Sequence, residues 1–455
     1  MRLEPESIKM LGALSEHHKL AIWDLNLTVK VNVENKLEIE IHYVSNLPEY
    51  ADEMTETAVL QITAEDFKKA VDQCETNWKE FVKMIATSPQ LSLQKMKNAV
   101  DSLVRVGKEL RYVLLQGGGT ASTDDREKLS RLTKYLTESA DGLRILVRSE
   151  QIHVPWNLFY LGSNDGHRGF LGYRHEVVEK VEDRVGILKG RKLQEFGEKS
   201  PFQFSLQRNL ELKHYSSIKA GGASPTYPKG GVEALIEMLK PYVTPQFRDN
   251  RAAFLKALQP PTAQDDFIYF ICHGDFDDSK VYFLKFSKTD NNLYATDVAV
   301  ELNQNPFPRQ PLVFLNACFG GSGGTVPYAK FTETFLGHGA NAIIGPILEV
   351  PASLAIEFAR NFFAELFGGD SHLPDGSLRT IPDVLFGVRR AIMDVPEGPD
   401  LSTLLYSVSI RRRAHFPWQF KIPDSSEQAN RASVDAVGLP AEIVSIVEGR
   451  TPKVG

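Results

Sequence analysis

The amino-acid sequence predicts an α/β fold in which helices cover both faces of a mainly parallel sheet. Short apolar runs bounded by turn residues occur at 266–274 and 311–318, and such runs are typical of fully buried strands in a parallel sheet. Stretches with apolar residues at helical spacing stand between and after these runs, for example over 352–366 and 381–393. Strands that alternate with helices in this way indicate crossover connections between parallel strands.

The composition is that of a globular protein with a sizeable core. The chain has 455 residues, of which 42% are hydrophobic and 24% charged, enough for two or three domains. The formal net charge of −6 gives no reason to expect direct nucleic-acid binding, and the basic run at 411–413 suits a solvated surface patch. We expect no membrane partner, because no stretch approaches the roughly 18 apolar residues of a membrane span and no signal peptide is visible.

Cysteine usage indicates a reducing compartment. The three cysteines, Cys74, Cys272 and Cys318, are too few for a disulfide framework and include no CxxC pair. We therefore expect a cytoplasmic protein without a structural zinc site.

The first 88 residues are predicted to form a small α+β accessory module. Apolar and polar residues alternate over 25–33 and over 37–43, which is the pattern of an antiparallel hairpin with one solvated face. Apolar residues at helical spacing then predict a helix over 64–84. Domain boundaries are placed accordingly at 1–88, 89–215, 216–420 and 421–455, the last being a C-terminal tail.

The elements after this module follow in a regular order. Helices are predicted over 91–115, 129–136, 232–239, 251–258, 331–336, 352–366 and 381–393. Extended segments are predicted over 142–147, 206–215, 266–274, 311–318 and 342–345. A flexible glycine-rich loop separates the first two helices at 117–123, and Trp418 closes the ordered pattern.

A histidine and a cysteine stand where two of the buried strands end. One strand is expected to end at His273-Gly274 and the other at Cys318. Ligands of open α/β sheets bind just beyond the carboxyl ends of the strands, so neighbouring strands would place His273 and Cys318 side by side at that edge. An imidazole that removes a thiol proton produces a nucleophilic thiolate, which predicts cysteine catalysis.

Other residues compete for these two roles. Cys272 lies inside the strand, and strand alternation points it to the face opposite His273. The second His-Gly pair, His338-Gly339, follows a helical segment, where glycine is expected as a C-cap. We therefore favour His273 and Cys318.

Two further stretches resemble ligand sites only in part. The glycine-rich stretch 320–325 lacks the lysine of a phosphate-binding loop and suits a flexible active-site loop better. The acids Asp275, Asp277 and Asp278 lack the order of an EF-hand calcium loop. We therefore expect no metal and no cofactor.

From about residue 103 to 420 the chain resembles the CHAT family of caspase-like cysteine peptidases, in the same clan as caspases and separase. The order and spacing of several short pieces carry the resemblance: Pro155-Trp156, His273-Gly274, the sequence Leu-Asn-Ala-Cys at 315–318 with the glycines that follow, 335–340, 343–350 and Trp418.

The resemblance implies a caspase-like three-layer fold with a degenerate half before a catalytic half. It also implies a His273–Cys318 dyad and an oxyanion hole made by backbone N–H groups at Gly274 and Cys318. Two features depart from the family pattern. No tetratricopeptide repeats are visible, and the stretch 345–351, where relatives often carry acidic residues, contains Glu349, a candidate wall of the substrate pocket.

The leading hypothesis is an endopeptidase that cleaves specific intracellular proteins in a regulated bacterial signalling or defence pathway. The alternatives are a catalytically inactive caspase-fold adaptor and a nucleotide-dependent switch. We expect a protein substrate and an activating or sensor protein. A separate protein, or a pro-segment of the substrate, is expected to dock on the N-terminal module and to order the loop at 320–325. The competing interpretation of that module is that it caps the sheet and is needed for folding.

Overall fold

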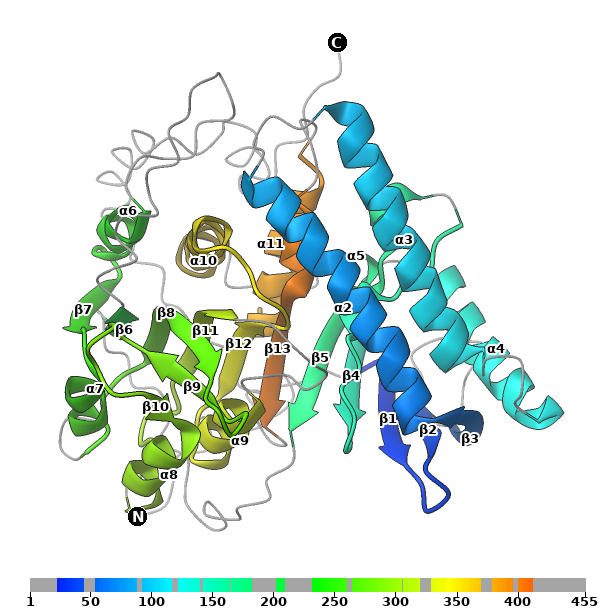
Figure 1. Ribbon diagram of the computed structural model, residues 1–455, viewed down its shortest axis with the longest axis horizontal. Helices are drawn as coiled ribbons and strands as arrows, with labels where there is room; N and C mark the ends of the chain where they lie inside the picture. Colours follow the sequence, from blue (N-terminus) through cyan, green and yellow to red (C-terminus); the bar gives the residue numbers. More distant parts are fainter. Residues whose placement is uncertain are drawn as a thin grey trace, which may run out of the picture.

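The computed structural model describes most of the chain between residues 23 and 411. The described residues are 23–44, 54–87, 92–116, 122–139, 142–163, 165–181, 202–208, 231–259, 264–304, 306–319, 329–369, 379–395 and 400–411. Figure 1 shows these residues as one large twisted sheet with helices on its two faces.

The strands of the described chain join into a single mixed sheet. Their order from edge to edge is β10-β9-β8-β11-β12-β13-β5-β4-β1-β2-β3, and β6 joins β7 to β8. The bounds are β1 Leu25–Val31, β2 Lys36–Tyr43, β3 Met54–Thr63, β4 Arg144–Ser149, β5 Glu176–Val181, β6 Phe202–Arg208, β7 Val243–Arg248, β8 Phe267–Phe276, β9 Tyr282–Lys285, β10 Leu293–Tyr294, β11 Leu312–Phe319, β12 Ala342–Pro346 and β13 Tyr406–Arg411.

Most neighbouring strands are parallel, as the alternating sequence pattern predicts. The run β7-β6-β8-β11-β12 is parallel throughout, and so is the run β13-β5-β4-β1. The two runs meet where β12 pairs antiparallel with β13. The carboxyl ends of β8, β11 and β12 therefore meet at one edge of the sheet, which is where ligands bind in α/β folds.

Helices pack against both faces of the central strands, so the predicted layered α/β class is confirmed. Along β8, Phe267, Tyr269 and Ile271 belong to one hydrophobic cluster, whereas Ile268 and Phe270 belong to a second. The longer helices are α2 Ala64–Thr87, α3 Leu93–Leu115, α4 Thr123–Glu138, α6 Gly231–Leu239, α7 Arg251–Ala257, α8 Ala295–Gln304, α9 Ala329–Gly337, α10 Ala352–Gly368 and α11 Ile381–Met393. Residues of α2, α6, α10 and α11 line the first cluster, and residues of α7, α8 and α9 line the second.

Local sequence signals explain where several helices begin. The Ser92 and Ser122 side chains accept hydrogen bonds from the first turns of α3 and α4, and Asn250 does the same for α7. Thr380 and Asp383 form a reciprocal capping box at the start of α11. Each cap satisfies a backbone N–H group that the helix itself leaves without a partner.

The N-terminal strands are part of the same sheet as the rest of the chain. β1 and β2 form the predicted antiparallel hairpin with alternating buried positions, and α2 follows as predicted. β1 also pairs in parallel with β4, from Leu25↔Ile145 to Val29↔Ser149. Hydrogen bonding therefore crosses the proposed boundary at residue 88, while the boundaries themselves stay predictions.

The structure differs from the sequence prediction at several strands. β3, β5, β7, β9, β10 and β13 are not predicted. β9 and β10 have only four and two residues, and β13 pairs with β12 and β5, which lie far away in the sequence. The predicted glycine-rich loop over 117–123 lies mostly outside the described residues, as do Trp418, the tail at 421–455 and the end of the extended segment 206–215.

Candidate active site

The backbones of His273 and Cys318 are paired directly across two neighbouring parallel strands. The β8–β11 ladder runs in register from Phe267↔Leu312 through His273↔Cys318 to Gly274↔Phe319. Register partners lie on the same face of a sheet, since side chains alternate with a period of two along each strand. The fold thus brings the two predicted positions together at the carboxyl edge of the sheet. Figure 1 shows their strands, β8 and β11, side by side.

The face that holds position 273 belongs to the first hydrophobic cluster, where Phe363 of α10 packs against Tyr269 with ring centroids 5.7 Å apart. His273 follows Tyr269 and Ile271 at alternate positions of β8, and both of these residues belong to that cluster. His273 itself is partly buried. Cys272 lies on the opposite face, where it is fully buried in the second cluster, as its place in the strand predicts. A buried core thiol is not accessible to a substrate, so Cys272 is excluded as the nucleophile.

β8 continues beyond His273, whereas the sequence predicts that it ends there. Its last residues pair antiparallel with β9, from His273↔Lys285 to Phe276↔Tyr282. The reason is a tight turn stabilised by Asp277, whose Oδ1 accepts hydrogen bonds from the backbone N–H groups of Ser279 (2.9 Å) and Val281 (2.9 Å). Such Asx turns are local structure that an apolar pattern does not reveal.

This turn also explains the acidic stretch at 275–278. Asp277 stabilises the hairpin, and its Oδ2 accepts a hydrogen bond from the Tyr294 hydroxyl at 3.2 Å. Asp275 accepts one from the Phe276 N–H at 2.8 Å. Among the described residues, no cluster of three or more His, Cys, Asp or Glu side chains is arranged to hold a metal ion.

Gly274 lies between two strands at this edge. Its backbone is the register partner of Phe319 in β11 and of Leu284 in β9. The predicted role of its N–H group in an oxyanion hole stays a prediction, as does that of the Cys318 N–H group. The side chain of Cys318 and the glycine-rich stretch after it, 320–328, lie outside what the structure describes.

Glu349 lies in the loop that follows β12, at the same edge of the sheet. Its carboxylate is exposed, yet partial desolvation raises its pKa above the ordinary value. The positive charge of Lys79 on α2 acts in the opposite direction, and the negative charge of Asp275 raises the pKa further. Three charged side chains from α2, β8 and the β12–α10 loop therefore interact electrostatically, and one of them, Asp275, stands two residues after His273.

The competing histidine lies at the other end of the sheet. His338 precedes β12, is 3% exposed, and contacts protein oxygen atoms with both ring nitrogens. Nδ1 lies 2.6 Å from the Thr334 carbonyl oxygen and Nε2 lies 3.0 Å from the Asn303 side-chain oxygen. Gly339 has a φ of +108°, as expected for a glycine that ends a helix. His338 is therefore a structural residue.

A buried polar network stands directly before Cys318, and sequence analysis does not identify it. Asn316 is 2% exposed, and its Nδ2 donates to the Tyr269 hydroxyl at 3.0 Å and to the Ala355 carbonyl at 2.6 Å. The Tyr406 hydroxyl donates to Asn316 Oδ1 at 2.9 Å. In the sequence, the only indication of this network is an asparagine inside an otherwise apolar strand, since buried polar groups need hydrogen-bond partners.

The family model of the CHAT domain matches residues 129–380, more than half of the chain and a range that includes His273 and Cys318. This chain belongs to the CHAT domain family. No curated protein sequence matches it. The fold comparison finds two crystal structures of the separase–securin complex from Saccharomyces cerevisiae, at 11% and 10% identity and with TM-scores of 0.39 and 0.40. Each match covers 89% of this chain and 31% of the other chain, so this chain spans about a third of their length.

The Pro155-Trp156 segment, which also lies within the range matched by the CHAT domain model, has a structural role. Trp156 is 4% exposed and stacks on Phe159 with ring centroids 5.3 Å apart. The adjacent Asn157 donates to the backbone carbonyl of Tyr406 at 3.0 Å. The Pro155-Trp156 segment is therefore core structure that connects to β13.

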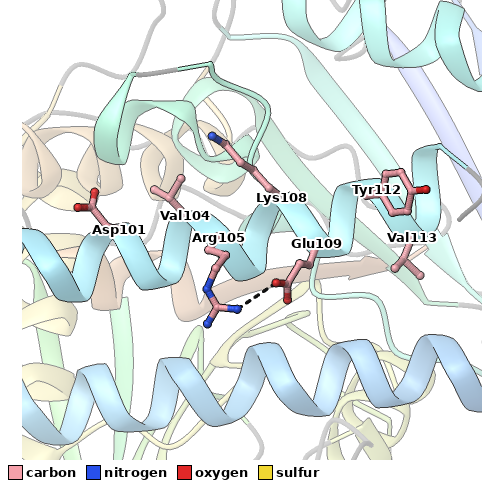
Figure 2. Close-up of a pocket in the computed structure, with 7 residues that line it drawn as sticks. All are labelled: Asp101, Val104, Arg105, Lys108, Glu109, Tyr112 and Val113. Carbon is pink, nitrogen blue, oxygen red and sulfur yellow. Dashed lines mark hydrogen bonds and ion pairs between the residues drawn. The ribbon is translucent and has the colours of Figure 1, made fainter.

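A hollow lies on α3, away from the candidate active site of the CHAT domain. Its volume is about 500 Å³, and it is lined by Asp101, Val104, Arg105, Lys108, Glu109, Tyr112 and Val113. Figure 2 shows these side chains along one helix, with an ion pair between Arg105 and Glu109 at 3.0 Å. None of the candidate catalytic residues lines it. Within the described chain, no helix combines the length and apolar character needed to cross a membrane.

Proposed function

We propose that this CHAT protein is a cysteine endopeptidase in which His273 and Cys318 form the catalytic dyad. The observation that carries the proposal is the register pairing of these two residues at the carboxyl edge of parallel strands. Membership of the CHAT family supports it, because the matched range contains both residues. The burial of Cys272 and the hydrogen bonds of His338 remove the competing candidates.

The proposed reaction proceeds in two covalent steps. His273 removes the thiol proton of Cys318, and the thiolate attacks the scissile carbonyl carbon. The tetrahedral intermediate collapses to a thioester as the imidazolium gives its proton to the leaving amine. Water, deprotonated by His273, then hydrolyses the thioester and regenerates the thiol.

Backbone N–H groups are proposed to stabilise the oxyanion, from Gly274 and Cys318. A single well-placed donor of this kind contributes about 3 kcal/mol to transition-state stabilisation. Gly274 suits the role because a residue without Cβ allows the substrate carbonyl to approach the backbone closely.

We also propose that cleavage is restricted to specific protein substrates and is controlled by an activating or sensor protein, in a bacterial signalling or defence pathway. The basis is the family resemblance, since CHAT relatives are commonly linked to sensors. A reducing cytoplasm agrees with two free cysteines, Cys74 and Cys272, that are fully buried in the core.

Profiling of protein N-termini in a cell extract tests the activity without a known substrate. The extract is incubated with wild-type protein, with Cys318→Ala and with His273→Ala. New N-termini are expected with wild-type protein only, because loss of a dyad member lowers the rate by several orders of magnitude. If wild type and Cys318→Ala give the same profile in extracts of the host that supplies any activator, the adaptor hypothesis replaces the peptidase.

A further inference from the structure

Asn316 connects the two strands that carry the candidate dyad, and it lies on the same face of the sheet as the two dyad positions. It stands two residues before Cys318 on β11, and its partner Tyr269 stands four residues before His273 on β8. Strand alternation places all four positions on one face. The 3.0 Å hydrogen bond between Asn316 Nδ2 and the Tyr269 hydroxyl therefore runs diagonally across the ladder that aligns His273 with Cys318.

The amide of Asn316 uses both of its N–H donors and its oxygen. The second N–H group donates to the Ala355 carbonyl in the first turn of α10, and the oxygen accepts from the Tyr406 hydroxyl on β13. A primary amide has two N–H donors, so no donor is left over. One side chain thus connects β8, β11, β13 and α10 in a region where the surrounding side chains are apolar.

Tyr406 is itself held firmly in place. Its ring stacks on Phe358 of α10 at a centroid distance of 3.8 Å, and its backbone carbonyl accepts hydrogen bonds from Arg389 Nη2 (2.7 Å) and Asn157 Nδ2 (3.0 Å). Arg389 is fully buried on α11 and also donates to the Gly172 carbonyl at 2.7 Å. The hydroxyl that reaches Asn316 therefore comes from a fixed position.

A slip of one residue between β8 and β11 would move Asn316 to the opposite face and break all three hydrogen bonds. The same slip would separate His273 from Cys318 by one register position. An apolar core side chain at position 316 would contribute packing but would not distinguish these registers, because apolar contacts are not directional.

We propose that Asn316, oriented by Tyr406, is a positioning residue that holds Cys318 in catalytic register with His273. This inference rests on the proposed function, since it assigns the network a role in the dyad. Asn316 does not contact the substrate. It acts by fixing the strand end from which Cys318 is presented.

The test measures the rate at which iodoacetamide alkylates Cys318 as a function of pH, with the modified peptide identified by mass spectrometry. An ordinary thiol has a pKa of about 8.5 and reacts slowly at pH 6, whereas a thiol paired with an imidazole keeps a reactive thiolate at that pH. The variants are Asn316→Leu and Tyr406→Phe, with His273→Ala as the reference for a broken dyad. Tyr173→Phe is the matched control, because it also removes one buried hydroxyl, which bonds to Asp394 at 2.9 Å.

We expect Tyr406→Phe and Asn316→Leu to lower the alkylation rate at pH 6 by about tenfold, toward that of His273→Ala, while Tyr173→Phe retains the wild-type rate. Melting temperatures are recorded in parallel. If Tyr406→Phe melts earlier but keeps the wild-type pH profile, the network is only structural and the inference is wrong. If Asn316→Leu does not fold, Tyr406→Phe still decides. If the wild-type rate is itself independent of His273, the proposed function fails instead.

Discussion

Cys318 and His273 are register partners in the ladder between β11 and β8, and Cys272, the residue before His273, faces the opposite layer. Two cysteines that lie close in the fold thus occupy different environments. Cys272 is fully buried among apolar side chains, whereas position 318 is on the face of His273 at the carboxyl edge of the sheet, where ligands bind in α/β folds. The two residues should therefore respond differently to substitution.

We predict that Cys318→Ala abolishes cleavage without unfolding the protein, and that Cys272→Ala retains cleavage. The second change removes one buried sulfur atom and should lower the free energy of unfolding by about 1 kcal/mol. Both effects are measured with a fluorogenic peptide made from a mapped cleavage site and by thermal unfolding. Loss of activity in Cys272→Ala with full activity in Cys318→Ala would show that the strand register is wrong.

Glu349 is predicted to favour a basic side chain in the adjacent part of the substrate. Its side chain is exposed in the loop after β12, and the negative charge of Asp275, two residues after His273, adds to the local potential. Glu349→Gln should lower kcat/KM for a substrate with lysine or arginine there by about tenfold, while a neutral substrate is little affected. A cleavage profile on a peptide library checks this, and an identical profile for both proteins would exclude Glu349 from the pocket.

A substitution of Lys79 tests the role of Glu349 in a second way. Its charge lowers the pKa of Glu349, so Lys79→Gln should raise that pKa and leave less of the carboxylate ionised at a given pH. As the pH is lowered, Glu349 becomes protonated and the preference for a basic residue disappears. This loss should occur at a higher pH in Lys79→Gln than in the wild type.

The N-terminal strands are predicted to be required for folding. Deletion of residues 1–88 removes β1 from its pairing with β4 and removes Trp78, which is fully buried and contacts Phe170 edge-to-face at a centroid distance of 5.7 Å. The deletion should give insoluble protein. Trp78→Ala should cost about 3–5 kcal/mol of unfolding free energy, against little for the exposed Glu80→Ala.

The deletion also bears on the proposed docking of an activator. A soluble truncation with an unchanged melting temperature and unchanged activity would contradict both the structural role and the docking hypothesis. Expression yield, circular dichroism and thermal unfolding measure the outcome.

Glu357 on α10 should make stability depend on pH. Burial, together with the negative charge of Asp400, raises its pKa from an ordinary value of 4.5 to about 7, although Arg360 acts in the opposite direction. Between pH 4.5 and about 7 the folded protein therefore holds a proton that the unfolded chain releases. The contribution of Glu357 to stability is most favourable below pH 4.5 and is lost as the pH rises through 7.

Glu357→Gln removes this dependence, because the amide does not ionise. At pH 8 the variant should be more stable than the wild type by up to about 3 kcal/mol in the free energy of unfolding, and it should therefore melt at a higher temperature. At pH 4.5 the two proteins should melt at similar temperatures. Melting curves at the two pH values measure the difference. The same difference in melting temperature between the two proteins at both pH values would mean that Glu357 does not titrate in this range.

The amino-acid sequence predicts the centre of the sheet better than its surroundings. Runs such as 267–272 and 312–315 are apolar at every position, because both of their faces are covered, and this pattern is visible without knowledge of the partners. β9 has only four residues, and β13 pairs with strands far away in the sequence. Strands of this kind depend on tertiary contacts, which local patterns do not encode.

The same distinction applies to the candidate site. The places of His273 and Cys318 follow from the ends of apolar runs and from the family resemblance. The Asn316 network does not, because Tyr406 lies 90 positions further along the chain and Tyr269 lies 47 positions before Asn316. The hydrogen bonds of Asp277 likewise extend β8 beyond the point where its apolar pattern stops.

The pH dependence of Cys318 alkylation in the wild type and in His273→Gln is the decisive measurement for the proposed dyad, because it needs no substrate. Cys74 and Cys272 are fully buried, so they should react slowly in the folded protein. With a His273–Cys318 dyad, the wild-type rate should stay high at pH 6, whereas His273→Gln should react with a midpoint near pH 8.5. Overlapping profiles with a midpoint near 8.5 in both proteins would contradict a His273–Cys318 dyad.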